Sequence, residues 1–214
     1  QAAAAIVWPS GAGMARIRES RQLEILIQIF SNRLLDAMRE RVGASYSPQA
    51  FSDWPSDIDA GGKIVALAQL KPEFVPVFFV EAQKIASDLA TTPPTLDEIA
   101  RVTEPLSQRV RRASTGNQFW LYNLEGASND PKRIELLRSL LADYSQTTPE
   151  VMKFLADRYF ASSDPLKLAV IPEGQQLAQA PEGQSLPVAA APAERVAPKS
   201  TPTPAPLTIT GQGR

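Results

Sequence analysis

The sequence of 214 residues contains neither histidine nor cysteine. Zinc sites in proteins use these two side chains together with carboxylates, so the sequence predicts no zinc site in this chain. Ser-His-Asp and Cys-His catalysis are excluded for the same reason. No Asp-rich loop typical of a calcium site is present either. We therefore expect no metal site, no cofactor and no catalytic residue within the chain itself.

Strong charge of one sign and long apolar runs are also missing. The formal net charge is −1, which argues against nucleic acid or an anionic membrane as partner. The local cluster Arg109, Arg111 and Arg112 is typical of a solvated helix face. No apolar run reaches the roughly 18 residues that span a bilayer, so the sequence predicts no membrane span.

The first residues, QAAAAIVW, lack both a methionine and a charged segment before the apolar run. We therefore predict no signal peptide, and we interpret the chain as a fragment of a longer polypeptide. The lack of cysteine fits an oxidising or a reducing compartment equally well.

The apolar pattern of the first half predicts strands and one long helix. Residues 1–8 read as a strand, and residues 14–41 carry apolar side chains at helical spacing on one face, namely Leu23, Leu26, Ile27, Phe30, Leu34 and Met38. An extended stretch at 44–54 and a strong strand at 63–70 follow, and we expect these two to form a hairpin.

The second half is predicted to be mainly helical. Helices are expected at 73–89, at 96–113 after a Thr95–Glu98 capping box, at 115–124, at 131–144 and at 148–159. A closing strand is expected at 167–171. The order is strand, helix, two strands, several helices, strand, which indicates an α+β two-layer sandwich with an antiparallel-rich sheet and helices on one face.

Beyond residue 172 the composition becomes rich in Pro, Ala, Gln and Ser and has no aromatic residue. Such a segment does not bury enough apolar surface to offset the entropy of ordering it. We predict one folded domain at 1–172 and a disordered tail at 173–214.

The stretch RLLDAMRERVGASYS at 33–47 is the most informative in the chain. It resembles the signature R-E-x-x-G-x-x-Y-S of the C-terminal half of zinc peptidases of the pitrilysin, insulin-degrading-enzyme and mitochondrial-processing-peptidase type. The predicted element order over residues 1–172 and, more weakly, GNQFWLYNL at 116–124 agree with the resemblance.

The resemblance implies the function of a non-catalytic half of a clamshell. In this family one half binds zinc through an H-x-x-E-H motif, and the other half supplies an Arg and a Tyr seven positions apart that hold the peptide substrate. The matching residues are Arg39 and Tyr46. The implied partners are the zinc-bearing N-terminal half or catalytic subunit and a peptide substrate. The implied parent protein is a zinc metalloendopeptidase, and a periplasmic location is compatible with the composition.

Other interpretations of these residues remain open. Arg39 is also typical of a surface residue near a helix end, and Tyr46 of a half-buried packing residue. Glu40 and Arg41 are expected to be solvated or ion-paired, and Asn117 to cap a helix or to contact another domain. Phe119, Trp120 and Tyr122 are interpreted as core or interdomain packing. The chain is alternatively a separate subunit of a peptidase, or a scaffold of the same fold that acts only in protein–protein interaction.

Overall fold

In the computed structural model, the described residues are 1–42, 47–56, 58–175 and 177. Four strands form one antiparallel sheet in the order β2-β3-β1-β4. They are β1 (Ala2–Pro9), β2 (Gln49–Asp53), β3 (Lys63–Leu70) and β4 (Leu166–Val170). The predicted hairpin of the second and third strands is present, with Phe51 opposite Val65. Its first strand is shorter than the stretch 44–54 that the sequence suggested, since β2 begins only after the buried Pro48.

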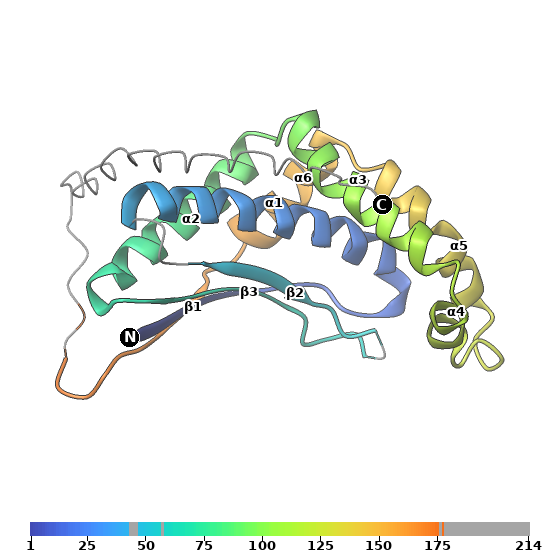
Figure 1. Ribbon diagram of the computed structural model, residues 1–214, viewed down its shortest axis with the longest axis horizontal. Helices are drawn as coiled ribbons and strands as arrows, with labels where there is room; N and C mark the ends of the chain where they lie inside the picture. Colours follow the sequence, from blue (N-terminus) through green and yellow to red (C-terminus); the bar gives the residue numbers. More distant parts are fainter. Residues whose placement is uncertain (43–46, 57, 176, 178–214) are drawn as a thin grey trace, which may run out of the picture.

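The helices of the described part lie on one face of this sheet (Figure 1). Their bounds are α1 (Ile17–Val42), α2 (Val75–Thr91), α3 (Leu96–Ala113), α4 (Asn117–Leu124), α5 (Lys132–Ser145) and α6 (Pro149–Ala156). Two short 3-10 turns precede α1 and α2, and a π-helical turn, Asp157–Ala161, extends α6. The predicted α+β class and element order are therefore confirmed. None of these helices is long and apolar enough to cross a membrane.

Alternation along β1 and β3 turns every second side chain toward the helices. In β1 these are Ala2, Ala4, Ile6 and Trp8, all buried. Trp8 packs edge-on against Phe30 of α1 and Phe160 of the π-helical turn, with ring centroids 5.8 Å and 5.0 Å away. This aromatic cluster joins the central strand to the first and last helical segments, so both ends of the domain share one core.

The start of α3 is fixed by the predicted capping box. The Thr95 side chain accepts a hydrogen bond from the backbone N–H of Glu98, and the Glu98 carboxylate accepts one from the backbone N–H of Thr95. Each of these bonds satisfies a backbone donor that the first helical turn leaves free. The capping box predicted from sequence is thus confirmed.

The predicted tail at 173–214 lies almost entirely outside the described residues, and Asp57 lies outside them too. Gly43, the glycine of the R-E-x-x-G-x-x-Y-S stretch, is also outside them.

Candidate functional site

Arg39 is held in place by the helix that carries it. All six side chains of the apolar stripe predicted for α1 are buried, and Met38, next to Arg39, is completely inaccessible. With 3.6 residues per turn, neighbouring side chains on a helix point about 100° apart. The buried Met38 side chain fixes the backbone of this turn, and the side chain of the next residue points away from the core. Arg39 is accordingly exposed.

The last turn of α1 is also tied to α2 by an ion pair. Arg41 Nε lies 3.2 Å from Oε1 of Glu81, whose side chain is 6% exposed. Arg41 was predicted to be either solvated or ion-paired, and the structure shows the ion pair. Arg39, by contrast, makes no ion pair and donates no side-chain hydrogen bond to any residue that the structure describes. Its guanidinium offers a planar, permanently charged set of donors to another molecule.

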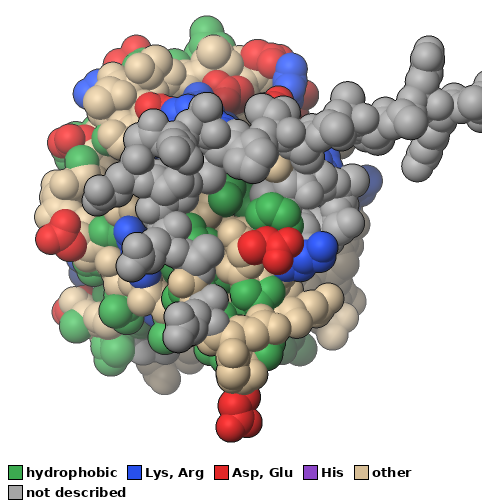
Figure 2. Space-filling model, turned by 90° about the vertical axis from the view of Figure 1, so that its left-hand side faces the viewer, with side chains coloured by type: hydrophobic (Ala, Val, Ile, Leu, Met, Phe, Trp, Pro, Cys, Tyr) green, Lys and Arg blue, Asp and Glu red, His purple; other side chains and the backbone are tan. Residues whose placement is uncertain are grey.

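Figure 2 views the molecule from the side where α1 ends in Figure 1. The visible charged side chains of both signs are interspersed with apolar ones and form no large patch of one sign. Tyr46, the second predicted substrate-binding residue, lies outside the described residues. The structure therefore gives the position of Arg39 and leaves the pairing of Arg39 with Tyr46 as a prediction.

The described residues do not fit a zinc ion. No group of three or more His, Cys, Asp and Glu side chains among them is arranged to hold a metal. The acidic side chains that are buried are committed elsewhere: Glu81 to Arg41, and Asp143 to Arg21 at 2.5 Å.

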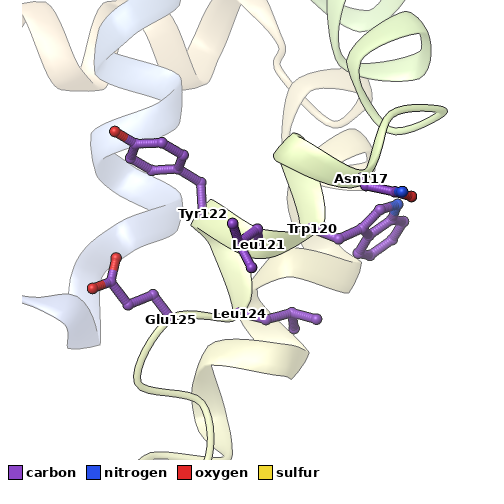
Figure 3. A pocket seen from close by; sticks show the side chains of 6 residues that line it. All are labelled: Asn117, Trp120, Leu121, Tyr122, Leu124 and Glu125. Carbon is purple, nitrogen blue, oxygen red and sulfur yellow. The ribbon is translucent and has the colours of Figure 1, made fainter.

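A second candidate surface lies on α4, where the side chains line a pocket of about 720 Å³ (Figure 3). Asn117, Trp120, Leu121 and Leu124 follow the i, i+3, i+4, i+7 spacing of one helix face. Trp120 is 45% exposed and Leu121 is 77% exposed. An apolar stripe that faces solvent on a helix with no buried residue is typical of a surface that contacts another protein.

The interpretation of Phe119, Trp120 and Tyr122 as core residues is wrong. Phe119 is half-buried, and Tyr122 is 75% exposed. Tyr122 points toward α1 in Figure 3 and borders a smaller pocket there, beside Ile17 and Arg21. The Trp120 indole N–H donates to the carbonyl of Ser114 at 2.8 Å, so even its polar atom is satisfied at the surface. Interdomain packing by these residues stays a prediction.

The predicted cap at Asn117 is absent. Gly116 occupies the N-cap position of α4, and no side chain caps that helix. Asn117 instead lines the pocket with Trp120. The stripe at 117, 120, 121 and 124 was visible in the sequence as a helical spacing, but spacing alone does not tell whether a stripe faces a core or solvent.

The structure places Arg39 and the α4 surface far apart. Both Ile17, which borders the pocket next to α4, and Arg39 are on α1. With a rise of 1.5 Å per residue, the 22 positions between them correspond to about 33 Å along the helix axis. Arg39 and the α4 surface therefore lie near opposite ends of α1.

No protein-family model matches the sequence, and no curated protein matches it. Solved structures do match the fold. The inactive peptidase domain of a protein described as a zinc protease from Bordetella parapertussis superposes with a TM-score of 0.63 at 15% identity, over 80% of this chain and 92% of that one. The M16 peptidase inactive domain from Pseudomonas fluorescens gives a TM-score of 0.61 at 15% identity, over 79% of this chain and 41% of that one.

A third match is the periplasmic protease PqqL from Escherichia coli, with a TM-score of 0.65 at 11% identity. It covers 80% of this chain but only 19% of the PqqL chain. The chain thus spans nearly all of one relative and a fifth to two fifths of the other two. At these identities the likeness describes the fold: the chain has the fold of M16, or pitrilysin-like, peptidase domains, inactive domains among them.

Proposed function

We propose that this chain acts as the zinc-free half of a two-half zinc peptidase and that it holds the peptide substrate through Arg39 and Tyr46. The observation that carries the proposal is the likeness of the fold to inactive peptidase domains. The absence of a metal-holding group among the described residues agrees with it. On this proposal, zinc and the general base belong to the partner half.

The chemistry of Arg39 suits this role. A peptide held in an extended conformation presents backbone carbonyls that need hydrogen-bond donors. Arg39 is exposed, and the neighbouring Met38 and the Arg41–Glu81 pair fix the helical turn that carries it. The backbone of Arg39 is therefore pre-positioned, so that only its side chain has to be ordered when a peptide binds.

The proposed partners are the zinc-bearing half, on the same polypeptide or as a separate subunit, and a peptide substrate. The parent assembly is proposed to be a metalloendopeptidase. We also propose a periplasmic location, supported by the fold likeness to PqqL, which is a periplasmic protease. Fractionation of cells that express the parent protein tests this location, and recovery only with cytoplasmic markers would contradict it.

The test of substrate binding uses Arg39→Ala and Tyr46→Phe in the complete assembly. Each variant is expected to lower peptide hydrolysis at least about tenfold, because a donor to the substrate is lost, while zinc content stays at the wild-type level. Arg111→Ala removes an exposed arginine from α3 and serves as the matched control. Wild-type turnover in both site variants would show that the two residues do not hold the substrate.

The alternative function is a scaffold that acts only in protein–protein interaction. The exposed apolar stripe of α4 favours a contact of this kind. If Leu121→Lys weakens assembly with a partner while Arg39→Ala leaves hydrolysis unchanged, the scaffold function is supported over substrate binding.

A further inference from the structure

The pocket on α4 has the composition of a peptide-binding surface (Figure 3). Four large apolar or aromatic side chains line it and are open to solvent: Leu121 and Tyr122 are 77% and 75% exposed, and Trp120 and Leu124 are 45% and 41% exposed. Single exposed apolar residues are normal, but a contiguous group marks an interaction surface. We call this surface the α4 pocket.

The polar groups of the α4 pocket limit what binds there. The Trp120 indole N–H already donates to the carbonyl of Ser114, so the ring offers its apolar surface to a ligand. Addition of a β-strand needs the free edge of a sheet, whereas the described lining residues belong to α4 or directly follow it. Proline-rich segments instead dock on aromatic surfaces in the polyproline II conformation, which has no internal hydrogen bonds. The α4 pocket therefore fits a proline-rich peptide.

The chain itself contains a segment of this kind. Four of the seven prolines beyond residue 172 lie within the sequence PKSTPTPAPL at 198–207. Polyproline II has three residues per turn, so one side of such a segment carries Pro198, Thr201, Pro204 and Leu207. Because the proline rings fix the backbone angle φ, less conformational entropy is lost when the segment binds.

The dimensions of the pocket and the segment agree. Asn117 and Glu125, the first and last lining residues, are eight positions apart, which corresponds to about 12 Å along a helix. Polyproline II rises about 3.1 Å per residue, so about four residues cover this length. The four residues 204–207 place the apolar side chains of Pro204 and Leu207 on the same side, about 9 Å apart.

The charges of the two stretches are complementary. Residues 114–131, which include α4, contain Glu125 and Asp130 and no Lys or Arg. Residues 195–214 contain Arg195, Lys199 and Arg214 and no Asp or Glu. Complementary charges favour this pairing and oppose the docking of an acidic segment in the same place.

The connection to the segment is long enough for it to reach the α4 pocket. The last described residues lie at the end of the molecule opposite α4 (Figure 1). Between these ends runs α1, whose 26 residues correspond to about 39 Å. Residues 178–197 span up to about 66 Å when fully extended, at about 3.3 Å per residue. A segment tethered in this way is present at a high effective concentration near its own α4.

We propose that the α4 pocket binds residues 198–207 of the same chain as an extended, proline-rich peptide. Of the tail that the sequence predicts to be disordered, these residues become ordered when they bind. Because the segment covers Trp120 and Leu121, it competes with any other protein that approaches α4. The inference involves neither zinc nor Arg39 and does not depend on the proposed function.

The test uses the full chain and a fluorescently labelled synthetic peptide of residues 196–210. The double variant Pro204→Asp, Leu207→Asp disables the segment of the chain itself, so that its α4 pocket is open. The peptide is expected to bind the double variant at least about tenfold more tightly than it binds the wild type, whose pocket is occupied. Hydrogen exchange in residues 117–124 is expected to be faster in the double variant than in the wild type.

Leu121→Lys, added to the double variant, is expected to weaken peptide binding at least about tenfold, because it places a cation where a basic, apolar segment docks. The Leu121 side chain already faces solvent, so this variant is expected to melt like the double variant. The matched control is Leu96→Lys in the same background, which makes the same change at a position that is 71% exposed at the start of α3. It is expected to leave peptide affinity unchanged.

Three results would overturn the inference. The peptide does not bind the double variant, or it binds the wild type and the double variant equally, which would show that the pocket is open in the wild type. In the third case the wild type forms a dimer that the double variant does not form, and the pocket then takes the segment of a second copy. None of these measurements involves peptide hydrolysis, so each outcome leaves the proposed function as it stands.

Discussion

Arg33 of α1 donates two hydrogen bonds to Glu98 of α3, from Nε to Oε1 at 2.8 Å and from Nη2 to Oε2 at 3.1 Å. The same Glu98 carboxylate completes the capping box of α3. One side chain thus fixes both the start of α3 and its position against α1. The paired guanidinium lowers the pKa of Glu98 from 4.5 to about 2.

Glu98→Gln is expected to destabilise the fold by about 1 kcal/mol at neutral pH. Glutamine keeps the capping box but loses the ion pair, which is partly solvated. Because the folded pKa is depressed, the stabilisation is present above about pH 4.5 and is lost as pH falls toward 2. Urea unfolding at several pH values measures this. Asp97→Asn, in a more exposed pair with Arg101, is the control. If the free energies of unfolding of the wild type and Glu98→Gln still differ as much at pH 2, the stabilisation does not come from the ionised Glu98 carboxylate.

Arg41→Ala is expected to lower the free energy of unfolding by about 2 kcal/mol. The Glu81 carboxylate is buried and would lose its cation, and a buried unpaired charge is costly. Arg39→Ala, two residues away and exposed, is expected to change stability by less than about 0.5 kcal/mol. Denaturant unfolding compares the two variants, and adding Glu81→Gln to Arg41→Ala should restore part of the loss. Equal effects of the two arginines would mean that Arg39 also has a structural partner.

Trp8→Ala and Trp120→Ala are expected to differ strongly in stability. Trp8 is 1% exposed and packs against two phenylalanines, so its removal is expected to cost about 3–5 kcal/mol. Trp120 is half-exposed, and its removal is expected to cost no more than about 1 kcal/mol, largely for its hydrogen bond. Thermal unfolding checks both. A loss above about 2 kcal/mol in Trp120→Ala would show that α4 belongs to the core.

The fold is expected to lose stability in alkaline solution through two tyrosines. Burial, with the neighbouring Glu19, raises the pKa of Tyr159 to about 12, and burial with Glu24 raises that of Tyr144 to about 12. Because the pKa of each tyrosine is higher in the folded chain than in the unfolded chain, its contribution to folding stability is complete below about pH 10 and is lost as pH rises toward 12. Tyr159→Phe, which removes the hydroxyl bonded to Glu19, is expected to reduce this loss. The free energy of unfolding measured between pH 8 and 11 tests this expectation. If it falls with pH as steeply in Tyr159→Phe as in the wild type, Tyr159 does not cause the loss.

Local signals predicted the elements well where one short-range rule decides them. The apolar spacing along α1 predicted its buried face, because a helix repeats every 3.6 residues. Thr95 and Glu98 predicted the start of α3, since the capping box needs only residues three positions apart. The hairpin of β2 and β3 followed from their closeness in sequence.

The same short-range rules could not predict features that depend on contacts between residues far apart in the sequence. The half-buried or exposed aromatic residues of α4 have the composition of a core segment, and only the three-dimensional structure shows that none of them is buried. The sequence alone also did not show that the sheet face turned away from the helices is apolar, because this depends on the pairing of Ala3 with Val170, two residues at opposite ends of the domain. For the candidate site, the sequence located Arg39 on the last turn of a helix. It did not show that Arg41, and not Arg39, pairs with Glu81, so that Arg39 has no ion-pair partner among the described residues.

The central place of β1 has a consequence for how the chain folds. Among the described strands β1 comes first in sequence, and it pairs with β3 on one side and with β4, the last of the four, on the other. Contacts between residues so distant in sequence form late, because closing a long loop costs entropy before any contact repays it. A chain that ends before Leu166 therefore leaves one edge of β1 without β4, while the other edge still pairs with β3.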